Sequence, residues 1–580
     1  RIMAPTDQLQ EVKIMLHGTA ASEGIGIGKV MLIEEHSLEY TPRTVTDTEA
    51  ESQRFKAAVD AFCYNTEKQA ENLRSSAGEK EAEILAGHIQ IIKDPYLSGE
   101  IEKLIADGQC AESALEHMCD MFIAMFSAAD DELTKQRAAD VRDIKSGVLG
   151  ILLGVNEIKV SDAPKGTVLV ARELTPSVTA GIVKENIAGI ITETGGTTSH
   201  SAILARALEI PAVLSVEGVA SSLKNGDTVV VDGSEGAVIV NPDDNTVAEY
   251  SKKRDAFLAE RKELENYRGR ETKSASGEAY ELFCNIGKPE DAVKAVDADG
   301  EGVGLFRTEF LFMDRTSIPT EDEQFEAYKK AALILKGKSL IIRTLDIGGD
   351  KDIPYLGLEK EENPFMGFRA IRYCLKNREL FKSQIKAILR ASAFGDIKIM
   401  FPLITTMDEL REGKKLVAEC KADLRNMGIN FNENIQVGVM VETASAAVIA
   451  DMLAKEADFF SIGTNDLTGY TMACDRGNND VSYLYSPLQP SVLRMIKRTI
   501  ECGVQNGISV GMCGEAAANK LMIPLLISFG LTEFSVSAPS VLNVRKIIST
   551  WTKEEADKVT AKVLEMSTQQ EIVEYLKSVV

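Results

Sequence analysis

The sequence lacks the features that mark membrane and secreted proteins. No run of about 18 apolar residues occurs within its 580 residues. Residues 1–15 also lack the apolar core of a signal peptide. We therefore predict no membrane-spanning helix and a cytoplasmic protein. The first residue is Arg1 rather than Met, and we predict that residues 1–16 are an N-terminal extension or a cloning remnant.

Paired metal-binding cysteines are missing as well. The chain has nine cysteines, and none forms a CxxC pair. This argues against a structural zinc site or a dithiol redox motif. The number is odd, so reduced thiols in a cytosolic enzyme are expected.

Positive charge is also scarce, because the formal net charge is −23. A nucleic-acid-binding protein needs Lys and Arg to neutralise phosphates, so we predict no nucleic-acid partner. Two interpretations of this excess of acidic residues stay open. It favours a basic protein partner, or it only keeps the protein in solution.

The length predicts two to four domains. The pattern of predicted helices and strands also changes along the chain. The predicted parts are an α/β domain, a helical domain inserted into it, a linker helix with a hinge, and a second α/β domain. Their ranges are 17–44 with 156–242, then 45–155, 243–277 and 278–580. Residues 268–277 are rich in Gly and Ser, which is typical of a flexible linker.

The C-terminal half alternates predicted strands with segments able to form helices. Eight strands are predicted at 281–286, 302–308, 339–345, 397–403, 435–441, 459–464, 508–513 and 533–537. Eight βα units in about 300 residues favour a closed (β/α)8 barrel.

Basic side chains follow several of these strands. Arg307 and Arg343 stand at predicted strand ends, and Arg476 follows the sixth strand. The C-terminal ends of barrel strands meet at one face of the barrel. Arginine forks bind phosphate and carboxylate groups. The set predicts a small, multiply anionic ligand, with unrelated surface salt bridges as the alternative.

Two carboxylates and a cysteine also lie at strand ends. Glu442 and Asp466 follow adjacent strands, and paired carboxylates with substrate oxygens are the usual way to hold Mg²⁺. Cys513 ends the seventh strand. Its position suggests a place among the ligand-binding groups, although a buried small hydrophobic role is equally open.

One histidine lies in an unusual loop. The segment Thr194-Gly-Gly-Thr-Thr-Ser-His200 lies between a predicted strand and an apolar helix. A helix N-terminus favours anions and disfavours imidazolium. We therefore predict that His200 is a neutral nucleophile whose phosphorylated form is stabilised there. His88, by contrast, shares an apolar helical face and is predicted to be a core histidine.

The combined motifs identify a resemblance. The run GGTTSHSAILARALEIPAVL resembles the phosphohistidine loop of phosphoenolpyruvate-utilising enzymes. Five further runs resemble the barrel of Enzyme I, the phosphoenolpyruvate–protein phosphotransferase of the bacterial sugar phosphotransferase system. They are GVGLFRTEFLFMDR, RTLDIGGDK, NPFMGFRAIR, FFSIGTNDLTGYTMACDRGN and GMCGEAA, among residues 302–517. The resemblance covers about residues 17–575 and implies an α/β fold with a TIM-like barrel and a swivelling phosphohistidine domain.

The resemblance also implies roles for particular residues. His200 would be phosphorylated at Nε2, and Thr179 would orient it. Phosphoenolpyruvate would be bound by Arg307, Arg343, Asn465, Asp466 and Arg476, with Mg²⁺ held by Glu442 and Asp466. Cys513 would protonate the departing enolate to give pyruvate.

The family's partners and architecture follow from the same resemblance. Residues 45–155 would bind the carrier protein HPr, and the barrel would form a homodimer. Two departures from the family pattern, Thr197 and Gly469, are expected to tune activity. The alternatives are a related phosphoenolpyruvate synthase or dikinase, which needs an additional ATP-binding domain, and a regulatory paralogue without catalysis.

Overall fold

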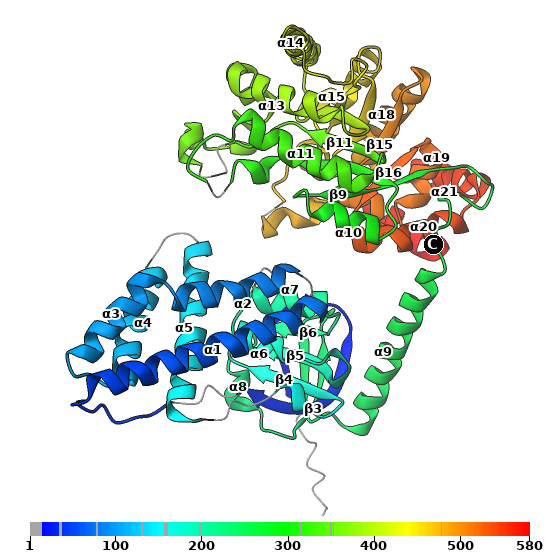
Figure 1. The fold of residues 1–580 in the computed structure, drawn as a ribbon. Coiled ribbons are helices and arrows are strands. Elements are labelled where there is room, and N and C mark those ends of the chain that lie inside the picture. The colour runs from blue at the N-terminus through cyan, green and yellow to red at the C-terminus, as the bar shows by residue number, and fades with distance from the viewer. Residues whose placement is uncertain are drawn as a thin grey trace, which may run out of the picture. The chain divides into compact units, whose positions relative to one another are not determined.

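A computed structural model describes residues 14–33, 38–76, 79–128, 132–155, 160–196, 199–313, 315–348, 351, 353–476 and 478–580. The chain forms two compact units, Arg1–Arg261 and Lys262–Val580. Figure 1 shows the elements of each unit.

The first unit contains a mixed eight-stranded sheet in the order β1-β8-β7-β3-β4-β5-β6-β2. Its strands are β1 (Ile14–His17), β2 (Thr19–Ser22), β3 (Ile25–Ile33), β4 (Thr167–Ala171), β5 (Ile187–Thr192), β6 (Ala212–Leu214), β7 (Thr228–Asp232) and β8 (Ala237–Val240). Side chains alternate between the two faces of a strand. On β4, Leu169 belongs to one buried apolar cluster, whereas Val168 and Val170 belong to another.

Five helices are inserted between β3 and β4, coloured blue to cyan in Figure 1. They are α1 (Thr48–Ser76), α2 (Glu79–Ile92), α3 (Pro95–Ala106), α4 (Ala111–Ser127) and α5 (Glu132–Leu153). Phe55 and Phe62 pack with Ile144 in their shared core. His88 is buried, and its Nε2 lies 3.3 Å from Asp140 Oδ1. The predicted core position of this histidine is confirmed.

Short helices complete the first unit, namely α6 (Pro176–Ala180), α7 (His200–Ala207) and α8 (Val219–Ser222). The long helix α9 (Asp244–Glu265) follows and crosses the division between the two units. Most of its side chains are exposed and only Thr246 is buried, which agrees with its predicted thin apolar face.

The second unit is a closed barrel of eight parallel strands, and all eight predicted strands are confirmed. They are β9 (Glu281–Ile286), β10 (Gly302–Arg307), β11 (Ser339–Arg343), β12 (Ile397–Phe401), β13 (Val437–Val441), β14 (Phe459–Ile462), β15 (Ser509–Met512) and β16 (Glu533–Val536). The predicted (β/α)8 fold is therefore confirmed.

Helices surround this barrel. They are α10 (Asp291–Asp297), α11 (Glu321–Leu335), α12 (Ile371–Lys376), α13 (Arg378–Ala391), α14 (Met407–Asn426), α15 (Ala444–Val448), α16 (Ala450–Leu453), α17 (Thr464–Met472), α18 (Pro490–Gln505), α19 (Ile523–Phe529), α20 (Val541–Thr550), α21 (Lys553–Glu565) and α22 (Gln569–Val579). Their apolar faces and the outward-facing strand residues form one large core.

The structure differs from the sequence-based boundaries at two places. Residues 14–16 were assigned to the extension, but Ile14–His17 pairs with β8 as a sheet strand. Residues 268–277 do not form a free linker, because Thr272 and Ser274 are buried. The Arg545 guanidinium donates to Thr272 Oγ1 at 3.0 Å. Gly and Ser permit flexibility, but this buried arginine holds the segment against the second unit.

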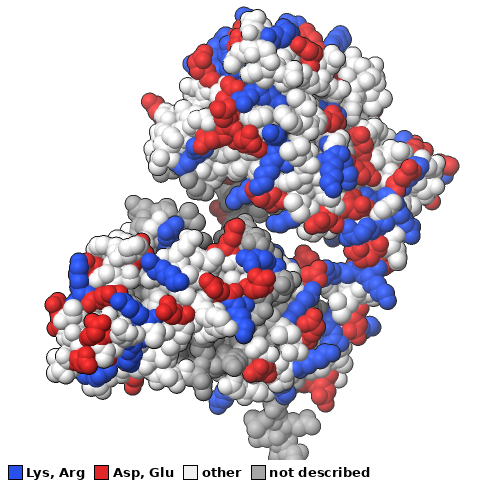
Figure 2. Space-filling model, viewed as in Figure 1, with Lys and Arg blue, Asp and Glu red and all other residues white. Residues whose placement is uncertain are grey.

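The surface and the cysteines agree with the composition. Among the described residues, no helix is both long enough and apolar enough to span a membrane. All nine cysteines are free thiols, and eight of them are buried. On the face shown in Figure 2, acidic and basic side chains are interspersed rather than gathered into one basic surface.

Candidate active site

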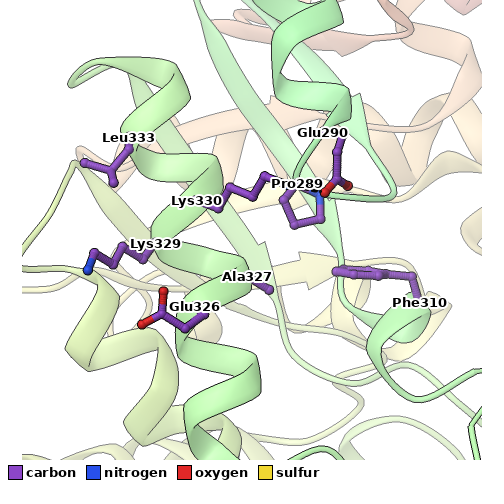
Figure 3. A pocket seen from close by; sticks show the side chains of 8 residues that line it. All are labelled: Pro289, Glu290, Phe310, Glu326, Ala327, Lys329, Lys330 and Leu333. Carbon is purple, nitrogen blue, oxygen red and sulfur yellow. Dashed lines mark hydrogen bonds and ion pairs between the residues drawn. The ribbon is translucent and has the colours of Figure 1, made fainter. Parts of the chain in front are cut away.

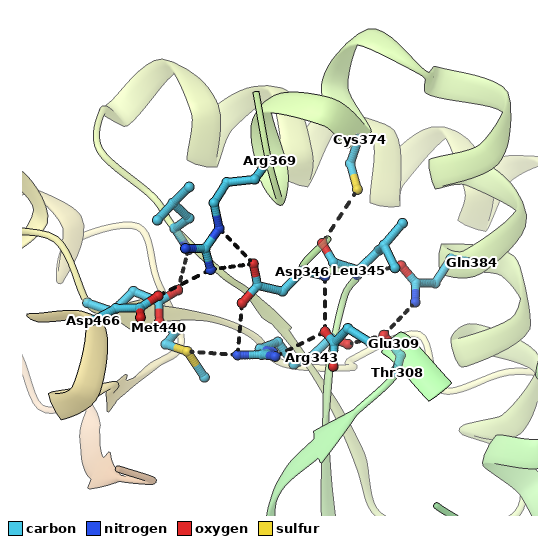
Figure 4. Close-up of polar contacts among 12 residues, drawn as sticks. Thr308, Glu309, Arg343, Leu345, Asp346, Arg369, Cys374, Gln384, Met440 and Asp466 are labelled. Atoms are coloured by element: carbon cyan, nitrogen blue, oxygen red, sulfur yellow. Dashed lines mark hydrogen bonds and ion pairs between the residues drawn. The ribbon is translucent and has the colours of Figure 1, made fainter. Parts of the chain in front are cut away.

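The end of β11 carries the first group of the candidate site. Arg343 is the last residue of this strand, and its guanidinium contacts Glu309 Oε1 at 3.0 Å and Asp346 Oδ2 at 3.1 Å. The Asp346 backbone N–H also donates to Glu309 Oε1. Burial alone would lower the pKa of Arg343, but the two carboxylates raise it above its ordinary value. Arg343 is therefore a fixed cation in a buried setting (Figure 4).

A second buried arginine bridges two acidic groups. Arg369 precedes α12, and its Nη2 lies 2.8 Å from Asp346 Oδ1 and 3.2 Å from Asp466 Oδ2. Its Nη1 donates to the Tyr470 hydroxyl at 3.3 Å. Figure 4 shows Arg369 above Asp346, with Arg343 on the opposite side. Asp346 thus lies between two guanidiniums, which hold its pKa below the ordinary value despite burial.

Three carboxylates at this end of the barrel could hold a metal ion. One oxygen from each of Asp346, Glu442 and Asp466 lies within 4.8 Å of the others. Burial, followed by repulsion from neighbouring carboxylates, raises the pKa of Glu442 well above its ordinary value. Burial likewise raises the pKa of Asp466.

The donor set decides which kind of ion fits these carboxylates. It consists of oxygens only, which suits a hard cation such as Mg²⁺ rather than zinc. A divalent cation would also relieve the repulsion that keeps Glu442 and Asp466 from ionising together. Asp346 already pairs with two arginines, so Glu442 and Asp466 have the more available oxygens.

A buried polar layer supports the backbone behind these groups. The Gln384 amide donates to Thr308 Oγ1 at 3.0 Å and accepts from the Leu345 N–H at 2.9 Å. The Thr308 hydroxyl in turn donates to the Arg343 carbonyl at 2.9 Å. These bonds connect the ends of β10 and β11 to α13. They fix the loop that positions Arg343 and Asp346.

Cys513 directly follows β15 and is 4 % exposed. Its Sγ contacts the Ile462 carbonyl at 3.8 Å. Burial raises the pKa of the thiol to about 11, although the Ser461 hydroxyl and Arg343 lower it. The thiol is therefore protonated at neutral pH, as a proton donor must be.

The other predicted ligands of the barrel lie at the same face but remain more open. The Arg307 side chain is exposed and makes no hydrogen bond or ion pair with the residues that the structure describes. Arg476 is 58 % exposed and pairs with Glu515 at 2.7 Å. Asn465 is the second residue of α17, and its carbonyl accepts from the Tyr485 hydroxyl at 2.8 Å.

The predicted nucleophile lies in the first unit. His200 begins α7, and the Ser199 hydroxyl caps this helix by accepting from the Ala202 N–H at 3.3 Å. Gly195, five residues earlier, has a φ of +107°, which favours glycine. Thr179 is buried on α6, and α6 packs against α7. The departure at Thr197 lies outside the described residues.

Sequence reasoning did not single out Arg369 or Glu309, which complete the buried charge network. Arg369 lies within NPFMGFRAIR, a run already associated with the family, but no strand ends there. Only the position of Arg369 within this run could have indicated its role. The other predicted departure, Gly469, lies on α17, where an added Cβ would come 3.2 Å from the Cys474 carbonyl.

A shallow pocket on another part of the barrel unit does not include any of these residues. Figure 3 shows it between α11 and the segments that carry Glu290 and Phe310. The Lys330 side chain there forms an ion pair with Glu290. This pocket is distinct from the predicted site.

Three family models match the chain. They describe the N-terminal part of a PEP-utilising enzyme over residues 17–137, the mobile domain over 163–236 and the PEP-binding domain over 261–552. Together with the barrel and its charged face, these matches define a phosphoenolpyruvate-utilising enzyme.

Curated relatives narrow this class. A phosphoenolpyruvate-protein phosphotransferase of Bacillus subtilis is 46% identical over 570 residues, which cover 98% of this chain and 99% of the relative. Proteins of the same name from Geobacillus stearothermophilus and Staphylococcus carnosus are 46% and 44% identical over 563 residues, 97% of this chain and 97% and 98% of theirs. The chain belongs to the phosphoenolpyruvate-protein phosphotransferase family, and the predicted resemblance is confirmed.

Proposed function

We propose that the protein transfers the phosphoryl group of phosphoenolpyruvate to its own His200 and then to the histidine of the carrier HPr, releasing pyruvate. The observation that carries this proposal is the buried charge network at the C-terminal face of the barrel. Two guanidiniums and four carboxylates lie together there, beside a protonated thiol. The full-length likeness to phosphoenolpyruvate-protein phosphotransferases supports it over the dikinase and the non-catalytic alternatives.

The substrate would be bound by cations of two kinds. Arg343 is held by two carboxylates and is mostly buried, whereas Arg307, at the end of β10, and Arg476, in the segment after α17, are exposed and can move toward a ligand. We assign the phosphate and carboxylate of phosphoenolpyruvate to these three arginines together with Asn465. Guanidinium forks held in a site with little water stabilise the charge that develops during phosphoryl transfer.

We propose that Glu442 and Asp466 bind Mg²⁺. When bound, the ion would neutralise charge on the phosphoryl oxygens. Arg369 would then serve as a positioning residue, because it holds both Asp346 and Asp466. In the absence of the ion, the raised pKa values of Glu442 and Asp466 reflect the cost of ionising neighbouring buried carboxyls.

The reaction itself would use His200 and Cys513. The lone pair of the neutral His200 imidazole would attack phosphorus, and the P–O bond to the enolate would break. The enolate would take the thiol proton of Cys513 at its terminal carbon, which gives pyruvate and a thiolate. Thr179 would orient the imidazole. The N-terminus of α7 would stabilise the phosphohistidine.

We also propose the domain roles and the partners. Residues 45–155 would bind HPr, residues 243–277 would contain the hinge for transfer between units, and the barrel would form a homodimer in the cytoplasm. Because Thr272 and Ser274 are buried within the second unit, we propose that the hinge lies before residue 268.

The test is to locate the phosphate. The protein is incubated with phosphoenolpyruvate, with or without Mg²⁺, and analysed by mass spectrometry. We expect one phosphate on His200, dependent on a divalent cation, and none in His200→Ala. His17→Ala is the matched control, because His17 is an exposed histidine on β1. Phosphate uptake by His200→Ala would overturn the proposal.

A further inference from the structure

A buried acid lies inside the barrel below the candidate active site. Glu533, the first residue of β16, is 4 % exposed. Its carboxylate carbon lies 2.8 Å from the point where a Cβ on Gly511 of β15 would stand, and its Oε1 lies 2.5 Å from the corresponding point of Gly304 on β10. β10 and β15 are not neighbours in the barrel. A carboxyl group between them therefore lies in the barrel interior.

The two glycines make the room for this acid. A side chain at Gly304 or Gly511 would overlap the Glu533 carboxyl group. Yet Glu533 Oε1 has no hydrogen-bond partner among the described residues. A buried polar group without a partner is costly and needs an explanation. Neither a salt bridge nor the packing of Glu533 among the described residues supplies such an explanation.

Polar groups continue from Glu533 toward Cys513. Ser535 is the next inward-facing residue of β16, and its Oγ also lies 2.5 Å from the Cβ point of Gly304. Glu533 Oε1 and Ser535 Oγ each lie 2.5 Å from the same point, so they are separated by at most twice this distance. The Ser535 hydroxyl donates to Asn285 Oδ1 at 2.6 Å, and the Asn285 amide donates to the Cys513 carbonyl at 2.9 Å.

The register of the strands places the acid one layer below the thiol. Gly511 is paired with Glu533, and Cys513 lies two residues beyond Gly511, which is roughly 6–7 Å along a strand. Ser461 on β14 is paired with Gly511 and is fully buried. Its hydroxyl lies beside the Cys513 thiol, whose pKa it lowers, and has no other partner among the described residues.

We propose that Glu533 returns the proton that Cys513 gives to the enolate. In this step the Glu533 O–H bond breaks and an S–H bond forms on the Cys513 thiolate, and the proton crosses the barrel interior past the Ser535 and Ser461 hydroxyls. The Glu533 carboxylate then takes a proton from solvent at the N-terminal end of the barrel. This inference rests on the proposed role of Cys513 as the proton donor.

The electrostatics agree with the direction of transfer. Burial and the nearby Glu281 raise the pKa of Glu533 to about 8, while Lys398 lowers it. The corresponding value for the Cys513 thiol is about 11. A proton therefore passes from the protonated carboxyl to the thiolate downhill.

Titratable side chains lie next to the acid at the N-terminal end of the barrel. Glu281 is exposed on β9 and is paired in register with Glu533 on β16. Lys398 lies at the same end, with its ammonium 5.8 Å from the Phe459 ring centre. Glu281, Lys398 and Cys513 are the titratable groups that act on Glu533 from β9, β12 and β15.

The test separates the first turnover from later ones in Glu533→Gln. Rapid quenching with phosphoenolpyruvate and Mg²⁺ measures pyruvate and phosphate on His200 in the first turnover, and steady-state pyruvate release with HPr measures the later ones. We expect a first turnover within twofold of the unsubstituted protein, because Cys513 begins protonated. We expect steady-state release to fall at least about tenfold and to lose any decrease above pH 8.

Thr560→Val is the matched control, since Thr560 is also buried with an unpartnered hydroxyl but lies on α21 outside the barrel. The first turnover and the steady-state pyruvate release should both be unchanged in Thr560→Val. Steady-state release within twofold of normal in Glu533→Gln would overturn the inference, as would a parallel fall of both phases. Failure of the proposed function looks different, because the unsubstituted protein would then place no phosphate on His200.

Discussion

Arg369 joins two acidic groups that no other described side chain connects in the same way. Its Nε and Nη2 both donate to Asp346, while Nη2 also reaches Asp466 and Nη1 donates to the Tyr470 hydroxyl. Lysine carries the same charge on a single ammonium and cannot form this fork. The geometry of the carboxylates therefore depends on an arginine at this position.

We accordingly expect Arg369→Lys to lower kcat/KM for phosphoenolpyruvate by about 10–100-fold, a loss of about 1.4–2.8 kcal/mol. The measurement is pyruvate release in the presence of Mg²⁺ and HPr. Arg411→Lys on α14, where the exposed Arg411 pairs with Glu456, is the control and should leave activity unchanged. A normal kcat/KM for Arg369→Lys would show that the bridge has no role.

Glu533 also makes a prediction about stability. Its pKa rises from an ordinary 4.5 to about 8 in the folded protein. Between these values the unfolded chain releases the proton while the folded protein keeps it, so rising pH removes stability. Glu533→Gln has no such proton.

We expect Glu533→Gln to match the unsubstituted protein near pH 4 and to exceed its stability increasingly up to about pH 8, by at most about 5 kcal/mol. Urea denaturation at several pH values measures this gap. A gap that does not change with pH would mean that Glu533 ionises normally in the folded state.

At this scale the sequence predicts some site residues better than others. Arg343, Glu442 and Cys513 stand at strand ends, so counting strands is enough to bring them to one face. Arg369 stands in an irregular segment, whose path no periodicity determines, and Glu309 begins a short 3-10 helix two residues beyond β10. Glu533 could not be foreseen, because its burial depends on glycines from two other strands, the neighbouring β15 and, beyond β9, β10.

Among the elements, α7 depends on its first turn. Ser199 caps this short helix directly before His200. Thr320 caps α11 in the barrel unit through a capping box with Glu323. The two caps are chemically similar, but only one adjoins the predicted nucleophile.

We expect Ser199→Ala and Thr320→Ala each to cost about 1 kcal/mol of stability in the unit that contains it. Only Ser199→Ala should also slow phosphate uptake by His200, because the helix start that receives the negative charge is then less ordered. Thermal denaturation and rapid-quench labelling measure the two effects. Equal uptake rates in both variants would contradict the assigned role of α7.

The strands show why elements are easier to predict than their surroundings. The barrel strands are short apolar runs separated by helix-length segments, and all eight occur within a few residues of their predicted bounds. The packing of segment 268–277 is harder to predict, because its Gly and Ser residues are equally compatible with a free linker. Its contact with Arg545 comes from a residue that lies far along the chain.

On the scale of the whole molecule, the two units have separate apolar cores. Phe55 and Leu169 belong to clusters made only of residues from the first unit. The large core around the barrel contains only residues of the second. Units with separate cores unfold independently when few contacts connect them.

We therefore expect two transitions in differential scanning calorimetry. Adding Mg²⁺ with the non-reactive analogue oxalate should raise only the transition of the barrel unit, because the proposed ligands all lie there. Glu442→Gln should remove that shift. One transition that moves as a whole would show that the units are thermodynamically coupled.

The helical insertion sets a limit on how far this chain can be shortened. β3 and β4 are parallel neighbours, and all five helices lie between them in the sequence. Parallel strands cannot be joined by a tight turn and need a crossover of about a dozen residues or more. The five helices are that crossover. A minimal version of the enzyme that omits them would need a replacement bridge across the sheet, since direct ligation of Ile33 to Thr167 would leave the two strands unable to pair.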